Sequence, residues 1–487
     1  MKRYTFLLIL SLIAGGSYSQ SVDNALKYSS QEYTGTARST AMGGAFGALG
    51  GDFSSLSINP AGIGVYRSSE FTFTPSVEYT KAENGGYSED KYSFTMGNVG
   101  YVASFIQKMA PAKGWQNFNF GIGYNRVANF NREGYVFNLN SETSLLDNWA
   151  SYASGTAPGS LYTFEEKLAY DTYLINNDDE NNYVSALYDG DIMDQQRHIT
   201  EKGYIGEYVL SFGANYAHRL YLGATIGIQD LYHKTTNSYS EYSLVGNTTS
   251  LNEFTFTEYT TTSGVGVNFK LGAIYKVTNQ FRIGAAIHTP TFYNLDEDYD
   301  TAMSSQFDPS ISAAFPEDGN AYHSYESEYV SRVNYDYETP FRTILSAAYL
   351  FGHKGVISLD YEMIDYRNAE FGFDNSDSDY EMTLNKAISN SYRSSSNLRI
   401  GAEYRMTPNL SLRGGFARIG DTYKGETDEG YNTYSGGFGL KQNNFFFDMA
   451  YQYKEYSEDY VLYSGSSDVA SLNSTNHQVR MTFGFKF

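Results

Sequence analysis

The chain alternates between apolar and polar residues over many separate stretches, and this period of two restricts its fold more than any other feature. In the last stretch, one set of alternate positions is apolar and the other mostly polar: Val479, Met481, Phe483, Phe485 and Phe487 against Gln478, Arg480, Thr482, Gly484 and Lys486. The same alternation recurs within 71–79, 357–363, 398–404 and 445–454. A period of two is the pattern of a β-strand with one apolar and one polar face. The chain is therefore predicted to be all-β.

These stretches predict about fourteen strands, an even number of the kind found in bacterial membrane barrels. We place them at 70–80, 95–108, 115–127, 204–218, 220–233, 264–277, 280–291, 340–351, 355–366, 397–406, 409–418, 431–440, 444–456 and 476–487.

The connections between these strands are alternately short and long. The short ones read APAKG, HR, TN, FGHKG, TPN and QNN. The long ones cover 127–203, 234–263, 292–339, 367–396, 419–430 and 457–475, with a smaller one at 81–94. Short periplasmic turns and long external loops are typical of outer-membrane barrels.

The polar faces carry charges that would be costly in lipid, so we expect them to line the lumen while the apolar faces meet the membrane. These charges are Asp360, Glu362, Arg399, Glu403, Arg405 and Arg480. The predicted fold class is a transmembrane antiparallel β-barrel over residues 70–487. A secreted all-β adhesin or lectin is the alternative, but it leaves the alternation of connection lengths unexplained.

Residues 1–19 are predicted to be a secretory signal peptide. Lys2 and Arg3 precede a short apolar run, and Ser17 and Ser19 precede a cleavage site before Gln20. No later stretch is apolar over the roughly 18 residues that a membrane-spanning helix needs. An exported chain of this pattern is expected in the outer membrane of a Gram-negative cell, among lipid and lipopolysaccharide. The terminal Phe487 resembles the signal that the barrel-assembly machinery reads.

Composition excludes several other classes of protein. The chain has no cysteine, which excludes disulfides and thiolate metal sites. Its formal net charge is −21, and nucleic-acid binding would need a basic surface. No Gly-x-Ser-x-Gly or His-Glu-x-x-His motif is present, so we expect no enzyme, no catalytic residue, no cofactor and no metal site.

Residues 20–69 do not alternate and are rich in glycine. A barrel of about fourteen strands is too wide for its own side chains to fill. We therefore predict that this segment is a hatch in the lumen, with Gly43, Gly44 and Gly47 allowing the backbone to approach the wall. Asn59 and Pro60 are expected to begin a turn or short helix, followed by Ala61. No P-loop or dinucleotide motif is present, and a flexible linker remains the alternative.

Three stretches resemble the FadL/TodX family of outer-membrane transporters for long-chain fatty acids and other hydrophobic compounds. They are GTARSTAMGGAFGALGGDFSSLSINPAGIG (35–64), FTFTPSVEY (71–79) and FNFGIGYNRVANFNREGY (118–135), the last similar to the Bacteroidetes-type "hemin receptor" branch. The resemblance implies a monomeric fourteen-stranded barrel with an N-terminal hatch that contains Asn59, Pro60 and Ala61. It also implies ligand capture outside and lateral release near a kink in the third strand. We expect Gly121 and Gly123 to admit that kink.

Two apolar helical patterns lie in the longest predicted loop. They place Leu145 and Trp149 on one helix, and Leu161, Phe164 and Leu168 on the other. The two helices either form a groove for a hydrophobic ligand or bury their apolar faces against one another.

Haem and divalent cations are the other candidate ligands. His198 and His323 lie in predicted external loops and are candidate axial ligands of haem. The acidic loops, such as NNDDENN and LDEDYD, are either solvated surface or cation-binding. The functional alternative to transport is a non-transporting barrel that acts as a haem receptor or as a component of a secretion system.

Overall fold

The computed structural model describes residues 22–33, 35–107, 111, 113–178, 180–315, 319–374, 378–425, 430–466 and 468–487. The predicted signal peptide lies outside the described residues. No helix in the described ranges is long and apolar enough to cross a membrane.

The wall is a closed antiparallel barrel of fourteen strands, as predicted. Most of them run without interruption: β1 (Glu70–Asn84), β2 (Tyr87–Ile106), β7 (Met193–Tyr216), β8 (Leu220–Ser243), β9 (Leu251–Lys276), β17 (Ser394–Arg405), β18 (Leu410–Ile419), β19 (Tyr431–Gln442), β20 (Phe445–Val461) and β21 (Val469–Lys486). The barrel closes because β1 pairs with β21 from Glu70↔Lys486 to Glu83↔Asn473.

The remaining wall positions are each shared by two or more strand segments. They are β3 (Trp115–Asn129) with β4 (Arg132–Ser141), β10 (Phe281–His288) with β11 (Phe292–Phe307), β12 (Tyr322–Glu326) and β13 (Ser331–Glu338) with β14 (Arg342–Leu350), and β15 (Gly355–Asp365) with β16 (Glu370–Gly372). Two of these interruptions coincide with Pro290 and Pro340, which have no N–H to give to a ladder. They lie beside each other, because the Thr339 amide donates to the Thr291 carbonyl over 3.1 Å.

The two faces of the wall differ as the alternation predicts. On β15, Ile357, Leu359, Tyr361 and Met363 are exposed on the outer face, while Ser358, Asp360 and Glu362 are buried on the inner face. Apolar side chains therefore face away from the lumen, and polar and charged ones line it.

Several predicted loops are strands instead, which corrects the sequence analysis. The 81–94 segment is mostly the hairpin of β1 and β2, and β7, β8, β9, β11, β13, β20 and β21 extend far into the other predicted loops. The acidic stretch LDEDYD lies within β11, where Leu295 and Tyr299 are buried and Asp296 and Asp298 are exposed. The alternation continues here with the opposite sense, because these extensions have water outside and apolar packing inside. Because their outer faces are polar, these extensions do not show the pattern expected of strands in lipid.

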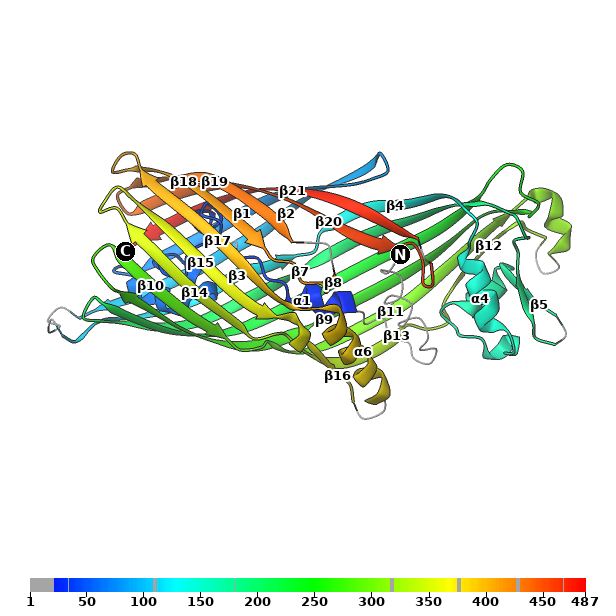
Figure 1. Ribbon diagram of the computed structural model, residues 1–487, viewed down its shortest axis with the longest axis horizontal. Helices are drawn as coiled ribbons and strands as arrows, with labels where there is room; N and C mark the ends of the chain where they lie inside the picture. Colours follow the sequence, from blue (N-terminus) through cyan, green and yellow to red (C-terminus); the bar gives the residue numbers. More distant parts are fainter. Residues whose placement is uncertain are drawn as a thin grey trace.

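The wall is of unequal height, as Figure 1 shows. The β7, β8 and β11 strands reach the far end of the molecule, where α4 and β5 lie, whereas β17 to β19 end near its middle. The far end carries α4 (Leu145–Ala153), η3 (Pro158–Ser160), α5 (Glu166–Asp171), β5 (Ile175–Asn177), β6 (Tyr183–Ser185) and η4 (Pro309–Ala314). The shorter side carries η5 (Tyr366–Asn368) and α6 (Ser378–Ser391).

Candidate functional site

The described residues between 22 and 69, here called the lumen segment, lie against the inner face of the wall. They form α1 (Val22–Ser29), α2 (Ala37–Ala41), α3 (Ser55–Ile58) and η2 (Pro60–Val65). The segment contacts strands on every side of the barrel: η2 packs on β7, β8 and β9, and α2 packs on β18 to β21. Figure 1 shows α1 within the outline of the barrel.

Glycines of the wall allow the lumen segment to touch the backbone of the strands. A Cβ atom on Gly223 would lie 2.1 Å from the Pro60 carbonyl oxygen, and one on Gly415 would lie 2.2 Å from the Gly43 amide nitrogen. The glycines of the segment do the same from the other side, since a Cβ on Gly43 would lie 3.0 Å from both the amide nitrogen and the carbonyl oxygen of Phe416. Glycine on both sides therefore brings the two backbones into direct contact.

Asn59 and Pro60 begin a short helix in the way their sequence suggests. The Asn59 side chain accepts a hydrogen bond from the Ala61 amide over 3.1 Å, and Pro60 is the first residue of η2. The same side chain donates to the Gly47 carbonyl over 2.6 Å. Asn59 thus joins two turns of the lumen segment as well as capping the helix.

Buried charges attach the lumen segment to the wall. The Glu207 carboxylate, fully buried on β7, accepts from the Ser57 hydroxyl and from the Lys270 ammonium, each over 2.6 Å. On the other side, Arg38 donates to Glu403 over 3.0 Å. Moving the lumen segment away would leave buried charged groups without these partners, which is costly. These contacts therefore hold the segment in one position.

The seam between β2 and β3 is open along its upper part. The two strands pair from Ile106↔Asn117 to Asn98↔Asn125 and then separate. Beyond this point β2 stays paired with β1, while β3 and β4 stay paired with β7. Residues 87–97 of β2 therefore have a hydrogen-bonded strand on one side only, and on the other side only side chains meet β4, with Lys91 3.6 Å from Glu133 and the Tyr87 ring 4.5 Å from that of Phe137. We call this interruption of the ladder the wall break.

The β4 strand turns inward at the wall break. A Cβ atom on Gly134 would lie 2.8 Å from Leu472 and 3.4 Å from Ala82, and these two residues belong to the inner faces of β21 and β1. The turn follows a bulge at Val127, where the register between β3 and β7 shifts. The Glu32 amide of the lumen segment donates to the Val127 carbonyl over 2.7 Å.

The position expected for the kink is therefore corrected. Gly121 and Gly123 lie within a continuous ladder, paired with β2 and with β7. Cβ atoms there would lie 2.7 Å from Leu56 and 2.6 Å from Phe53 of the lumen segment. These glycines make room for the lumen segment, and the strands separate only after Asn125, where a bulge in β3 changes its direction.

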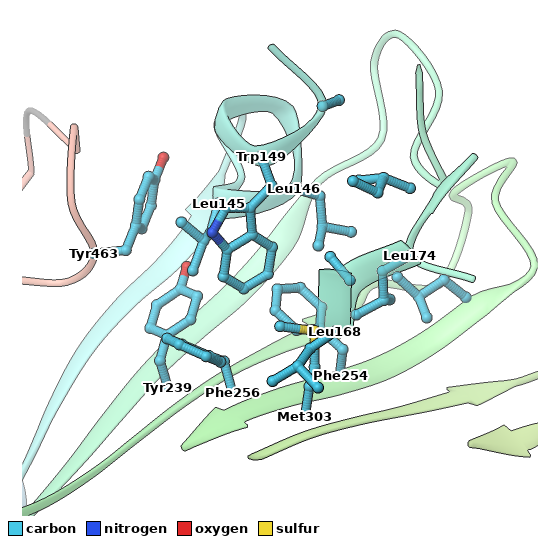
Figure 2. Packing of buried hydrophobic residues seen from close by; sticks show 14 of the residues in the cluster. Leu145, Leu146, Trp149, Leu168, Leu174, Tyr239, Phe254, Phe256, Met303 and Tyr463 are labelled. Atoms are coloured by element: carbon cyan, nitrogen blue, oxygen red, sulfur yellow. The ribbon is translucent and has the colours of Figure 1, made fainter. Parts of the chain in front are cut away.

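Helices form in both predicted places, as α4 and α5, but α5 begins only at Glu166, so Leu161 and Phe164 precede it and the prediction that they share a helix with Leu168 is wrong. The apolar residues of both patterns are packed against other parts of the chain. Leu145, Trp149, Leu161, Phe164 and Leu168 are all buried. Figure 2 shows Trp149 and Leu168 facing Phe254, Phe256 and Met303 of the strand extensions. Of the two possibilities left open by the sequence, burial of the apolar faces describes this geometry. A cleft of about 490 Å³ beside α4 is lined mainly by hydroxyls and carboxylates, and none of the five residues lines it.

Solved structures of similar shape include proteins described as hydrocarbon channels or transporters. The P. putida toluene transporter TodX matches with 14% sequence identity over 93% of this chain and 98% of that chain, with a TM-score of 0.52. A Pseudomonas aeruginosa FadL homologue matches with 12% identity over the same shares and a TM-score of 0.53. The CymD monoaromatic hydrocarbon channel matches with 13% identity, the same coverage and a TM-score of 0.52. The chain has the fold of the FadL/TodX channels. No family model and no curated protein matches the sequence.

Two buried carboxylates support the core formed by α4, α5 and the strand extensions around Trp149, here called the external core, and neither was predicted from the sequence. Glu165 accepts from the Trp149 indole over 3.0 Å, and Glu241 accepts from the Leu145 amide over 2.9 Å. Burial raises the pKa of each to about 7, although these hydrogen bonds oppose the shift. Their inward positions on long strands and loops become visible only once the strand extensions are known.

The external core is expected to loosen as the pH rises. The pKa of each carboxyl group is higher in the folded core than in the unfolded chain, so its neutral form favours folding. The free energy of unfolding of the core therefore decreases between about pH 5 and pH 8, as the groups ionise. Hydrogen exchange of 145–153, corrected for the intrinsic rate, should be faster at the higher pH. E165Q and E241Q should each reduce this dependence, and its persistence in both variants would contradict the assignment.

The candidate haem ligands lie in separate aromatic clusters. His198 stacks on Tyr135 with ring centroids 4.2 Å apart, and His323 packs on Phe315 and Tyr173 at 4.7 Å. Within the described ranges, no group of three or more histidine and acidic residues could hold a metal ion.

Proposed function

We propose that the protein takes hydrophobic small molecules, such as long-chain fatty acids or aromatic hydrocarbons, inward across the outer membrane. The observation that supports the proposal is that a segment packed against the inner wall lies beside an interrupted strand ladder, since the Glu32 amide donates to the carbonyl of the bulged Val127. In this proposal the lumen segment blocks a straight path along the barrel axis, and the wall break is the way out. TodX is described as a toluene transporter and CymD as a monoaromatic hydrocarbon channel, and both have this fold.

In this proposal residues 20–69 are the hatch, with Asn59, Pro60, Ala61, Gly43, Gly44 and Gly47 as its structural motif. A ligand is captured at the external end, where α4 and α5 would have to part for it to reach Leu145, Trp149, Leu161, Phe164 and Leu168. It leaves sideways through the wall break. Burial in apolar surroundings contributes about 0.8 kcal/mol for each methylene group, which suits long alkyl chains and aromatic rings.

The remaining parts of the proposal concern targeting. Residues 1–19 direct export, and the monomeric barrel sits in outer-membrane lipid beside lipopolysaccharide. Phe487, which is 73% exposed at the barrel rim, is available to the barrel-assembly machinery.

Uptake measurements test the proposal. Vesicles with an outer leaflet of lipopolysaccharide that contain the purified protein should accumulate a radiolabelled fatty acid or toluene about tenfold faster than protein-free vesicles of the same composition, because the polar sugar layer slows apolar solutes and the protein gives them a path past it. Native mass spectrometry after mild extraction identifies what co-purifies. Equal rates for both probes in the two preparations, together with a stable complex with other envelope proteins, would favour the non-transporting alternative.

A further inference from the structure

Glu201 on β7 is the meeting point of the lumen segment and the inward-turned strand. Its carboxylate lies 2.6 Å from the Lys27 ammonium of α1 and 2.7 Å from Nε of Arg132, the first residue of β4. The Glu201 side chain is only 6% exposed. One carboxylate therefore holds two elements that are about a hundred residues apart in the sequence.

The surrounding contacts distinguish the two cations. Arg132 is also paired with Glu458 and donates to the Tyr460 hydroxyl over 2.6 Å, both on β20. The Arg132 side chain therefore bridges β7 and β20, and these contacts hold the start of β4 inside the barrel. Lys27 pairs with Glu201 alone among the ion pairs described. His233, which bonds the Tyr28 hydroxyl, is 4.0 Å from the carboxylate.

We propose that Glu201 is a positioning residue that couples withdrawal of α1 to the open state of the wall break. Lys27 and Arg132 share one oxygen: Oε1 of Glu201 is 2.6 Å from Lys27 and accepts from Nη2 of Arg132 over 3.1 Å. Two cations at one carboxylate repel each other and compete for it. When α1 moves away with Lys27, Arg132 gains the whole carboxylate, and β4 is held more firmly in its inward position.

This inference rests on the proposed passage through the wall break, since it assigns the break a link to the hatch. Linkage makes the coupling reciprocal: whatever strengthens the contact of Arg132 with Glu201 weakens the seating of α1. A ligand that displaces α1 would thereby keep its own exit open.

Hydrogen exchange on the full-length protein in detergent tests the coupling without any transport measurement. In K27Q, peptides over 22–29 should exchange faster, whereas those over 132–138 should exchange about threefold slower, because the competing cation is gone. In E201Q both regions should exchange faster. If Glu201 had only a structural role, exchange would become faster over both 22–29 and 132–138 in K27Q as well as in E201Q.

K454Q is the matched control. Lys454 joins the lumen segment to β20 through Glu32 over 2.5 Å, away from Glu201. It should change exchange near 31–33 and leave 132–138 unchanged. Unchanged or faster exchange of 132–138 in K27Q overturns the coupling. K27Q replaces a partly exposed side chain, and Glu201 keeps Arg132 as its partner, so no buried charge is left unpaired. K27Q therefore tests the coupling even if E201Q does not assemble. If the parent protein gives no uptake while the variants show the expected exchange pattern, the proposed function is contradicted and the coupling stands.

Discussion

Replacing Gly415 by alanine is expected to open the barrel to hydrophilic solutes. The new methyl group would lie 2.2 Å from the Gly43 amide and 2.4 Å from the Met42 carbonyl carbon, so the backbone of the lumen segment has to move. Overpacking of this kind costs about 1–3 kcal/mol, which shifts the equilibrium between seated and displaced segment by roughly tenfold or more. Single-channel conductance in planar bilayers measures the effect.

The neighbouring Gly414 provides a control on the same strand. A Cβ atom there has no atom within 4 Å, so G414A should conduct like the parent protein. Heat-modifiable migration in electrophoresis checks that both variants assemble. Equal, low conductance in G415A and G414A would show that the new methyl group does not displace the lumen segment, and equal, high conductance in both would show that residues 22–69 do not obstruct the lumen.

Replacing Trp149 by alanine is expected to disrupt the external core. The side chain is 1% exposed, and its ring lies 5.1 Å from that of Phe256. Truncation of a buried tryptophan costs about 3–5 kcal/mol, and it also leaves the Glu165 carboxylate without its indole donor. Tryptic cleavage after Lys167, in α5, should become much faster while the barrel still inserts.

The same variant tests the proposed ligand residues. If α4 and α5 part to admit a ligand, W149A and F164A should both lower uptake of a hydrophobic probe. Tyr152, which lies on the same helix and is 50% exposed, is the matched position, and Y152A should change neither proteolysis nor uptake. Normal uptake in W149A and F164A would remove the five apolar residues from the proposed route.

Sequence reasoning found the wall segments because lipid and water impose opposite demands on alternate residues of a spanning strand. This demand is local, so the pattern of β15 or β21 can be recognised without knowledge of its neighbours. The same reasoning reached the glycine-rich lumen segment, since a wide barrel and a stretch without alternation leave few other arrangements. It also identified Asn59 and Pro60 as a helix start, because capping depends on adjacent residues.

It did not find the strand extensions beyond the apolar band. In β11 the buried positions are covered by other parts of the chain: Leu295 packs in a cluster that includes Ala25 and Tyr28 of α1, and Tyr299 packs on Phe164. The acidic sequence LDEDYD would be equally compatible with a solvated loop. Whether Trp149 lines a groove or fills a core likewise depends on what lies opposite it.

By itself, the sequence determined where the apolar-faced parts of the wall strands run and that the glycine-rich stretch before them lies apart from them, because those properties follow from each residue's contact with lipid, water or its nearest neighbours. Only the tertiary structure decided where the seam between β2 and β3 opens and which charges meet there. Lys27, Arg132, Glu201 and Glu458 come from four distant parts of the chain, and nothing local in their sequence requires them to meet. Barrel closure and the seating of the lumen segment bring them together.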